Sequence, residues 1–487
     1  MKRIFVLLIG LLSVLSMQAQ VSVTDLRCEM LVNPLGIDVT QPRLSWQINS
    51  NQRNVQQQSY QLIVASSVEK LNQNIGDLWN SGTISSGQSV HVVYNGKTLQ
   101  SKTTCYWKVK IVTNKGTSEW SKPAYFNIGL LNKDDWKGKW IGYDKASAWD
   151  SMVMHARLSA RYLRKEFTSA QTIKSAKVYI VGLGLYELFI NGKKVGNNIL
   201  TPSPTDYRKT VQYNTYDVTT MLRTGKNAVA ATLGNGRFFN MRQNFKTDRL
   251  LNFGFPKMLL QLEIEYANGS KQIIVTDESW KLNVDGPVRT ANEYDGEEYD
   301  ATKELTGWNN INYNDSKWLT PEIVKAPDGV LRAQMNEPMR VMKTIKPLSI
   351  KKTGASTYIL DMGQNFAGWL QLKVKGKAGT KVTMRFAESI QPNDSLYTAN
   401  LRSAYQTNIY TLKGTGVEVW HPSFIYNGFR FVEITGYPGV PTVNDFEGMV
   451  VYDGFATTGS LQTSDTIINK VLKNAWWGIS SNYKGMP

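Results

Sequence analysis

The sequence is poor in the residues that most often build metal centres and nucleophilic active sites. It holds two cysteines and three histidines in 487 residues, and they are widely scattered. Zinc sites need Cys and His ligands at short, defined spacings, and no such spacing occurs. Cys-His and Ser-His nucleophile systems are equally poorly supplied, and no P-loop or dinucleotide fingerprint is present. We therefore predict a protein that requires no cofactor.

Long apolar runs are also scarce, and the one that occurs stands at the N-terminus. Lys2 and Arg3 precede an apolar stretch over 4–15, and Ala19 then supplies a small residue for cleavage. This order is typical of a signal peptide, and the run is too short for a typical membrane-spanning helix. We predict a signal peptide over 1–19, no membrane span, and a periplasmic or secreted mature protein.

The two cysteines, Cys28 and Cys105, lie in the first quarter of the chain. An exported protein reaches an oxidising compartment, where a disulfide forms and persists. Two buried free thiols fit the sequence at least as well, because free cysteine is among the residues most often found in protein cores. Both alternatives stay open from the sequence.

Acidic residues are fewer than basic ones, 39 against 56, which leaves a formal net charge of +17. Such a surplus favours a nucleic-acid or membrane partner when it is concentrated in one patch. Here Lys and Arg are spread along the whole chain, without a basic run of five or more. The sequence therefore predicts solvated charged faces and no nucleic-acid partner.

The length predicts about three domains, and the first block, 20–128, has the pattern of a β-sandwich. Apolar and polar residues alternate in short runs, which is typical of half-buried strands. Three runs stand out: 44–48, 60–65 and 105–112. We predict a fibronectin-III-like sandwich. Its core is expected to hold three tryptophans: Trp46, Trp107 and Trp120.

The second block, 129–345, carries four strong strand patterns: 176–181, 186–190, 228–233 and 257–264. Asn191-Gly192 follows the second of these, and both residue types readily adopt a positive φ, which is typical of a tight hairpin. The size of the block and its long loops predict a jelly roll, which is a candidate carbohydrate-binding module.

The third block, 346–456, again contains strand patterns: 357–361, 368–374, 381–386 and 429–434. It predicts another β-sandwich. The predicted fold class is therefore all-β, with tandem β-sandwich domains in the order fibronectin-III-like, jelly roll and β-sandwich.

The last segment, 457–487, breaks the β pattern with one amphipathic helix. Thr463 or Ser464 is the expected cap, and Asp465 stands in the first turn. The expected apolar stripe has helical spacing: Ile467, Ile468, Val471, Leu472, Ala475, Trp476 and Ile479. A lone helix needs a packing partner, so it either docks on the third sandwich or begins a further domain.

The densest acidic cluster runs from Asp295 to Asp300. Glycoside hydrolysis uses two carboxyl groups placed across a sugar. An extended backbone places Glu297 with Tyr299 on one side of the cluster, and Glu298 with Asp300 on the other. We interpret the cluster as a solvated loop or sheet edge and assign no catalytic pair to it.

Two loops of the second block, 201–207 and 234–240, combine polar and aromatic residues in a way that suits sugar recognition. Asn, Asp and Arg make directional hydrogen bonds to hydroxyls, and Tyr or Phe offers a flat apolar face. The predicted substrate-binding residues, with the neighbouring hairpin included, are Asn191, Asp206, Asn235 and Arg237. The competing interpretation is that Asp206 and Asn235 only shape turns.

Several motifs occur in a fixed order along the chain. The first block has LRCEMLVNPLG at 26–36 and PRLSW at 42–46. The second has GLGLYELFING at 182–192, LTPSPTDY at 200–207, YNTYD at 213–217, LGNGR at 233–237 and YDGEEYDA at 294–301. The third has DMGQNFAGW at 361–369, HPSFIYNGFR at 421–430 and TGYPG at 435–439. Together they resemble the N-terminal domains of the bacterial α-L-rhamnosidases, glycoside hydrolase family 78.

The resemblance implies an inverting hydrolase that removes terminal α-L-rhamnosyl residues from glycans or glycosides. One acidic residue protonates the leaving oxygen and another activates water, both on an (α/α)6 barrel. In the family, the helix that matches 463–483 begins that barrel, and an acidic stretch follows the motif found here at 485–487. No catalytic residue is therefore assigned, and the chain by itself is expected to be inactive.

The resemblance also implies rhamnose-containing glycans as partners and calcium as a candidate ion. In some relatives a jelly-roll domain resembles a rhamnose-binding module with bound calcium, and the matching loops here surround Asn191, Asp206 and Asn235. Arg237 departs from the family pattern, which more often has an aromatic residue there. The alternative hypothesis is a non-catalytic rhamnose-binding or carbohydrate-binding protein made of these sandwiches.

Overall fold

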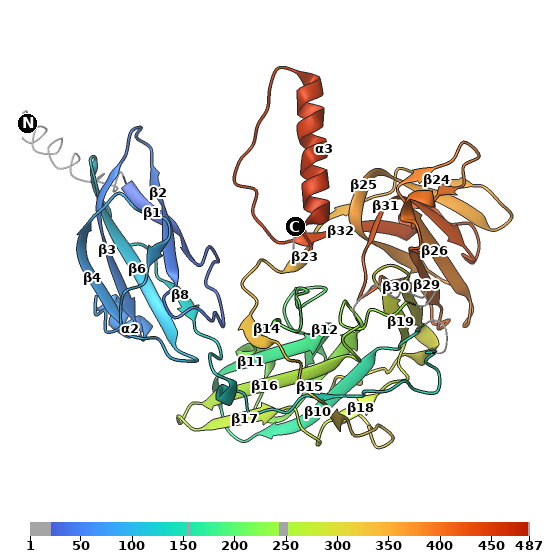
Figure 1. Cartoon of the computed structure of the whole chain (residues 1–487), viewed down its shortest axis with the longest axis horizontal. Coiled ribbons are helices and arrows are strands. Elements are labelled where there is room, and N and C mark those ends of the chain that lie inside the picture. Colours follow the sequence, from blue (N-terminus) through green and yellow to red (C-terminus); the bar gives the residue numbers. More distant parts are fainter. Residues whose placement is uncertain (1–20, 153–155, 243–251, 486–487) are drawn as a thin grey trace, which may run out of the picture. The chain divides into compact units, whose positions relative to one another are not determined.

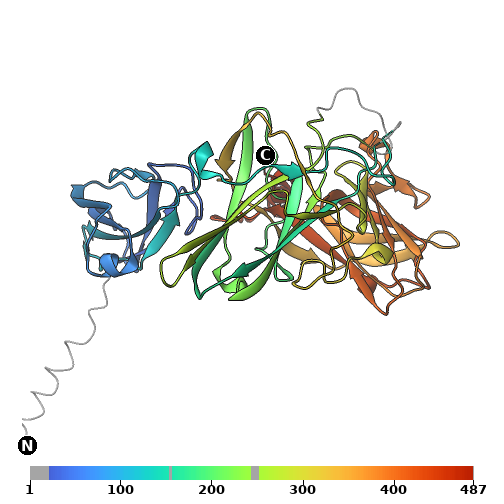
Figure 2. The same ribbon diagram turned by 90° about the horizontal axis from the view of Figure 1, so that it is seen from below.

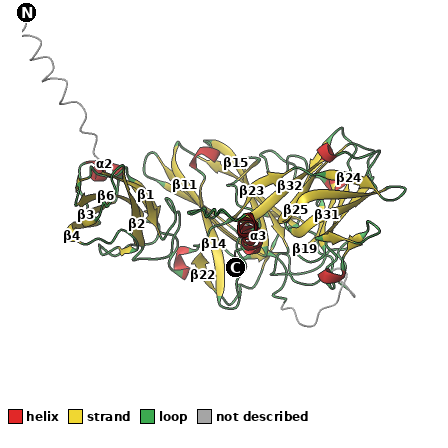
Figure 3. Cartoon of the chain, turned by 90° about the horizontal axis from the view of Figure 1, so that it is seen from above, coloured by secondary structure: helices red, strands yellow, loops and turns green. Residues whose placement is uncertain are grey.

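The computed structural model in Figure 1 describes residues 21–152, 156–242 and 252–485. The predicted signal peptide lies outside these residues. The chain divides into two compact units, Met1–Trp136 and Lys137–Pro487. Strands dominate both units (yellow in Figure 3), and the all-β fold class with tandem sandwiches is confirmed.

The first unit is a sandwich of two antiparallel sheets. The smaller sheet has the order β1-β2-β5, with β1 at Val21–Cys28, β2 at Arg43–Ser50 and β5 at Val92–Val93. The larger has the order β4-β3-β6-β7, with β8 paired to β6; its strands are β3 (Gln57–Ala65), β4 (Trp79–Ser85), β6 (Thr104–Thr113), β7 (Gly116–Thr117) and β8 (Ala124–Asn127). The short helix α2 (Val68–Asn72) follows β3.

The core of the first unit confirms two of the three predicted tryptophans. Trp46 and Trp107 are fully buried, and the Trp46 indole nitrogen donates to the Gln57 side chain at 3.0 Å. Trp120 is only half-buried, because it lies after β7 at the edge of the sandwich, where the Lys108 ammonium covers its ring at 5.1 Å. Cys28 and Cys105 are buried free thiols, and burial raises the pKa of the Cys105 thiol to about 12.

The second unit begins with the jelly roll, the green strands of Figure 2. Its five-stranded sheet has the order β13-β12-β15-β10-β18, with β10 at Arg161–Ser169, β12 at Leu185–Ile190, β13 at Lys193–Lys194, β15 at Gly225–Gly234 and β18 at Lys281–Asn283. Asn191 and Gly192 join β12 to β13 with φ of 49° and 81°. The predicted tight hairpin is confirmed.

The facing sheet has the order β21-β9-β16-β11-β14-β22, with β17 paired to β16. Its strands are β9 (Ile141–Gly142), β11 (Ile173–Leu183), β14 (Thr210–Asp217), β16 (Lys257–Tyr266), β17 (Lys271–Val275), β21 (Glu322–Ile323) and β22 (Val330–Ala333). Inward residues of both sheets form one apolar core around the buried Trp280. This alternation of inward and outward residues is what the sequence pattern predicted.

The third sandwich is built on a ten-stranded sheet of the order β19-β20-β29-β26-β31-β25-β32-β23, with β24 and β30 paired to β25. Its strands are β19 (Val288–Asn292), β20 (Gly296–Asp300), β23 (Met339–Ile345), β24 (Ser349–Lys352), β25 (Thr357–Val374), β26 (Lys381–Ala387), β29 (Thr407–Thr411), β30 (Glu418–Trp420), β31 (Asn427–Thr435) and β32 (Phe446–Asp453). The strands β27 (Ser389–Ile390) and β28 (Leu396–Tyr397) form a separate hairpin.

Strands from the predicted jelly-roll block thus enter the sheet of the third sandwich. β20 pairs in parallel with β29, and β23 pairs antiparallel with β32. The jelly roll and the third sandwich belong to one compact unit for this reason. Short 3-10 turns connect several elements: Lys133–Asp135, Thr219–Met221, Ala301–Lys303, Ala399–Leu401 and Val443–Asp445.

The long helix α3 (Thr466–Asn482) packs against the third sandwich through Trp477, which is 8% exposed. Its N-cap is Asp465 and not the predicted Thr463 or Ser464. The Asp465 carboxylate accepts from the backbone N–H groups of Ile467 and Ile468. Five residues of the predicted stripe are exposed: Ile467, Ile468, Val471, Ala475 and Ile479. No helix in the described ranges is long and apolar enough to cross a membrane.

Candidate functional site

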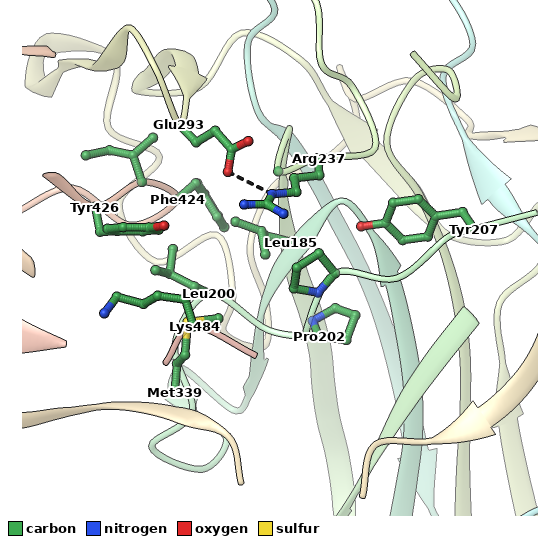
Figure 4. Close-up of a pocket in the computed structure, with 13 residues that line it drawn as sticks. Leu185, Leu200, Pro202, Tyr207, Arg237, Glu293, Met339, Phe424, Tyr426 and Lys484 are labelled. Carbon is green, nitrogen blue, oxygen red and sulfur yellow. Dashed lines mark hydrogen bonds and ion pairs between the residues drawn. The ribbon is translucent and has the colours of Figure 1, made fainter. Parts of the chain in front are cut away.

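A pocket opens where the jelly roll meets the third sandwich, inside the second unit (Figure 4). It encloses about 470 Å³ of space, part of which is open to solvent. Its apolar walls come from both sandwiches and from the first residue of β23: Leu185, Leu200, Pro202, Pro204, Met339, Phe424 and Ile425. Its polar and aromatic groups are Tyr207, Arg237, Glu293, Tyr426 and Lys484.

Arg237 and Glu293 form the charged part of the pocket. The Arg237 Nε atom lies 3.1 Å from a Glu293 carboxylate oxygen, and the side chains are 42% and 17% exposed. Burial lowers the pKa of Arg237, but the charge and the hydrogen bond of Glu293 outweigh burial and raise it. The guanidinium has five N–H donors, so the ion pair leaves several of them for a ligand.

Two tyrosines border the pocket from opposite sides. Tyr207 lies in the loop after β13 and Tyr426 directly before β31, and Figure 4 shows the Tyr207 hydroxyl pointing toward the pocket. Burial is the main cause that raises the pKa of both phenols. They stay protonated at neutral pH and supply both an apolar face and a hydroxyl donor.

Lys484, from the segment after α3, closes one side of the pocket. It is 8% exposed, and its ammonium lies 5.3 Å from the centre of the Tyr426 ring. Burial lowers the pKa of Lys484 to about 8, against the opposing charge of Asp453. The segment is held in place because the Gly485 N–H donates to both Asp453 carboxylate oxygens at 2.9 Å.

Close backbone contacts position the loop that carries Arg237. A Cβ atom at Gly184 would lie 1.9 Å from the Asn235 carbonyl oxygen, and one at Gly234 would lie 2.3 Å from the Phe424 ring. Only glycine fits at these two positions. The motifs 182–192 and 233–237 therefore hold the Arg237 loop against the third sandwich.

The structure brings one of the four predicted binding residues into this pocket, namely Arg237. Asp206 adjoins Tyr207, but its carboxylate is paired with Arg208 at 2.9 Å. Asn235 is buried, and its carbonyl accepts from the Phe239 N–H. These contacts agree with the competing interpretation, in which Asp206 and Asn235 shape turns and do not bind a ligand.

Asn191 lies at the β12–β13 turn and is engaged within the jelly roll. Its side-chain amide donates to the Met221 carbonyl and to Asn227, and its oxygen accepts from the Ala228 N–H. Asn191 and Asp206 thus contact separate partners within the jelly roll. Within the described ranges, no group of three or more His, Cys, Asp or Glu side chains is placed to hold a metal.

The acidic cluster 295–300 was interpreted as a solvated loop or sheet edge, and this is wrong for Asp295 and Glu297. Asp295 is fully buried and paired with Arg242, and Glu297 is 1% exposed. Burial raises the pKa of Glu297 to about 8, although the backbone N–H groups of Phe424 and Ser423 lower it by donating to the carboxylate. These two residues are buried because β20 pairs between β19 and β29 instead of lying at an edge, whereas Glu298 and Asp300 are half-buried.

Sequence reasoning missed Glu293, Tyr426 and Lys484. Glu293 stands in the turn between β19 and β20, and Tyr426 lies inside the motif at 421–430. The motif was the available signal for Tyr426, and for Glu293 it was the position directly before the motif at 294–301. Lys484 had no local signal, because its role depends on the return of the chain from α3 to the pocket.

The pocket is suited to binding a polar ligand with an apolar face. Among the described residues that line the pocket, Glu293 is the only carboxylate, and it is already paired with Arg237. A glycosidase of the inverting type needs a second carboxyl group across the scissile bond. The lining residues therefore offer recognition groups but no hydrolytic pair.

Comparison with known proteins identifies three successive domains. Residues 23–132 match the Rha78A-like N-terminal immunoglobulin domain, 171–343 match the alpha-L-rhamnosidase N-terminal domain, and 351–452 match the bacterial alpha-L-rhamnosidase concanavalin-like domain. An alpha-L-rhamnosidase of Formosa agariphila is 34% identical over 93% of this chain and 50% of its own length. One from an Alteromonas strain is 34% identical over 94% of this chain and 50% of its own length.

Solved structures give the same result. The alpha-L-rhamnosidase from Dictyoglumus thermophilum is 39% identical, with a TM-score of 0.88 over 95% of this chain and 52% of that protein. The Streptomyces avermitilis alpha-L-rhamnosidase complexed with L-rhamnose is 28% identical, with a TM-score of 0.89 over 96% of this chain and 61% of that protein. The chain spans about half the length of the curated relatives it matches.

Three domains matched in order, together with 34% to 39% identity across nearly the whole chain, set the family assignment. Four of the motifs that carried the resemblance supply residues to the pocket: 182–192, 200–207, 233–237 and 421–430. The chain belongs to the bacterial α-L-rhamnosidase family, glycoside hydrolase family 78, and contains its N-terminal β-sandwich domains.

Proposed function

We propose that this chain is the sugar-recognising, non-hydrolytic part of an exported α-L-rhamnosidase. The whole enzyme would remove terminal α-L-rhamnosyl residues from glycans or glycosides by an inverting mechanism. The observation that carries the proposal is the family match over three successive domains. The signal-peptide pattern at 1–19 supports export.

The site chemistry supports assigning the hydrolytic step to residues outside this chain. The described part of the chain contributes one carboxylate to the pocket, and Arg237 neutralises it. The exposed apolar residues of α3, among them Ile467 and Val471, support the packing of a helical catalytic domain against this helix. A helix of this kind is stabilised mainly by what it packs against.

Two measurements test this assignment. The purified chain should not hydrolyse an aryl α-L-rhamnoside, whereas a full-length relative assayed beside it should. The intact mass of the native secreted product should be far above the 54.9 kDa of this chain. Hydrolysis by the 487-residue chain at a rate like that of the relative would place the catalytic pair within it and contradict the assignment.

A second candidate function is carbohydrate binding by the sandwiches themselves. The specific observation in its favour is the pocket that combines Arg237 and Glu293 with Tyr207 and Tyr426. Calorimetry with L-rhamnose, with and without calcium, tests the binding and the predicted calcium dependence together. The variant Arg237→Ala should weaken binding.

The matched control for that variant is Arg208→Ala. Arg208 is an exposed arginine of the same domain that is also ion-paired, to Asp206, but it does not line the pocket. Its replacement should leave rhamnose binding unchanged. Equal effects of the two substitutions would show that the response is a general charge effect rather than recognition in the pocket.

A further inference from the structure

A second concavity lies on the outer face of the five-stranded jelly-roll sheet. It encloses about 780 Å³, part of which is open to solvent. Its floor is formed by β10, β12 and β15, and the loop 304–309 forms one wall. It shares Phe424 with the Arg237 pocket but none of that pocket's charged residues.

A half-buried tryptophan, Trp308, forms the aromatic wall of this concavity. Its ring meets Tyr162 and Phe189 edge-on, at 5.3 and 5.8 Å between ring centres, and stacks on Trp318 at 6.0 Å. Aromatic faces of this kind pack against the C–H face of a pyranose ring. The concavity therefore has an apolar wall of suitable chemistry for a sugar.

The loop that carries Trp308 is fixed from below by a buried arginine. Arg164 on β10 is 1% exposed, and it donates to the carbonyls of Trp308 and Asn310 at 2.8 Å. It also pairs with Asp315 and Glu166. Such a network holds the wall in one conformation before any ligand arrives, which lowers the entropic cost of binding.

The polar groups of the concavity include two carboxylates, several hydroxyls and the Asn309 amide. Glu187 on β12 lies directly opposite Thr232 on β15, and Glu304 comes from the loop. Lys194 neutralises Glu187 at 2.5 Å, and Lys413 neutralises Glu304 at 2.6 Å. A carboxylate has about four acceptor positions, so both retain capacity for ligand hydroxyls while the rim stays near neutral charge.

We propose that this concavity is a second sugar-binding site, specific for a neutral pyranose of the 6-deoxyhexose class. The two carboxylates, Glu187 and Glu304, can accept hydrogen bonds from neighbouring hydroxyls of a sugar. Because each carboxylate is balanced by a lysine, the site favours a neutral ligand over an anion or a polycation. Leu305 and Val288 add apolar surface beside Trp308, which suits the C6 methyl group. The choice of L-rhamnose as the probe rests on the proposed function, whereas the site itself rests on the geometry.

The experiment is fluorine NMR of the full chain labelled with 5-fluorotryptophan, with the Trp308 resonance assigned from Trp308→Phe. L-rhamnose should shift this resonance in the wild-type chain and in Arg237→Ala. The variant Glu187→Gln removes one charge-assisted acceptor and should weaken the interaction about tenfold, and Thr232→Val should weaken it by a smaller factor. Both changes preserve side-chain shape. In the absence of sugar, the spectrum of each variant should match that of the wild-type chain, which shows that the variant retains the fold.

The outcomes separate this proposal from the proposed function. No shift of the Trp308 resonance at about 50 mM sugar, a concentration that detects even weak binding, would overturn the second site. So would a shift that Glu187→Gln leaves unchanged. A shift abolished by Arg237→Ala alone would assign binding to the first pocket, which would leave the proposed function standing and refute the second site.

Discussion

Glu297 should make the stability of the second unit fall as the pH rises from 4.5 to 8. Its side chain is 1% exposed, and both oxygens face the backbone N–H groups of Ser423 and Phe424. Burial raises its pKa from 4.5 to about 8. The folded chain therefore holds one more proton than the unfolded chain in this window, and the free energy of unfolding decreases as the pH rises.

The expected magnitude follows from the raised pKa. At roughly 1.4 kcal/mol for each factor of ten, a rise from 4.5 to about 8 corresponds to about 3 to 5 kcal/mol across the window. The variant Glu297→Gln cannot ionise, but its amide oxygen still accepts a backbone hydrogen bond. Relative to the wild type, it should gain about this much stability between pH 5 and pH 8.

Urea unfolding at pH 5, 6, 7 and 8 measures the difference. The matched control is Glu298→Gln, because Glu298 is the neighbouring residue but is paired with Arg157 near the surface. Its pH dependence should parallel that of the wild type. Parallel curves for the wild type and Glu297→Gln would refute the reasoning, since they would mean that Glu297 releases its proton without cost inside the fold.

Three further predictions concern the helix, its following segment and a buried ion pair. Asp465→Ala should destabilise α3 by about 1 kcal/mol, measured by hydrogen exchange of its amides, whereas Ser464→Ala should have no effect because Asp465 is the cap. Lys484→Met should raise the melting temperature at pH 7. The gain should shrink toward pH 10, because the wild-type lysine, with its pKa lowered to about 8, becomes more stably folded as the pH rises through 8 to 10.5. Asp150→Asn should cost about 3 to 5 kcal/mol in chemical denaturation, because it leaves the fully buried Arg161 without its counter-charge; a loss below 1 kcal/mol would contradict this.

Local pattern was sufficient for most strands. The runs 60–65 and 228–233 fall inside β3 and β15, because short, largely apolar runs are typical of strands buried in a sandwich core. The runs 357–361 and 368–374 become the two ends of one strand, β25, with an irregular register between Asp361 and Phe366. Gly363, with φ of 71°, permits that irregularity.

Long-range pairing explains what the pattern did not predict. The acidic cluster was interpreted as solvated because charged residues are usually exposed. Asp295 and Glu297 are buried because β20 inserts beside β29, more than 100 residues later in the chain. The cap of α3 is Asp465 instead of the predicted residue for a local reason. Its carboxylate accepts from two N–H groups of the first turn that have no partner within the helix.

The sequence by itself determined the all-β class, the hairpin at Asn191 and, through the order of its motifs, the family. These features depend on residue type and spacing, which act over a few neighbours. The tertiary structure alone decided that Arg237 meets Glu293, that Lys484 closes the same pocket, and that Trp308, fixed by Arg164, lines one concavity with Glu187. These contacts join residues from separate strands and loops, and only the packing of the two sandwiches brings them together.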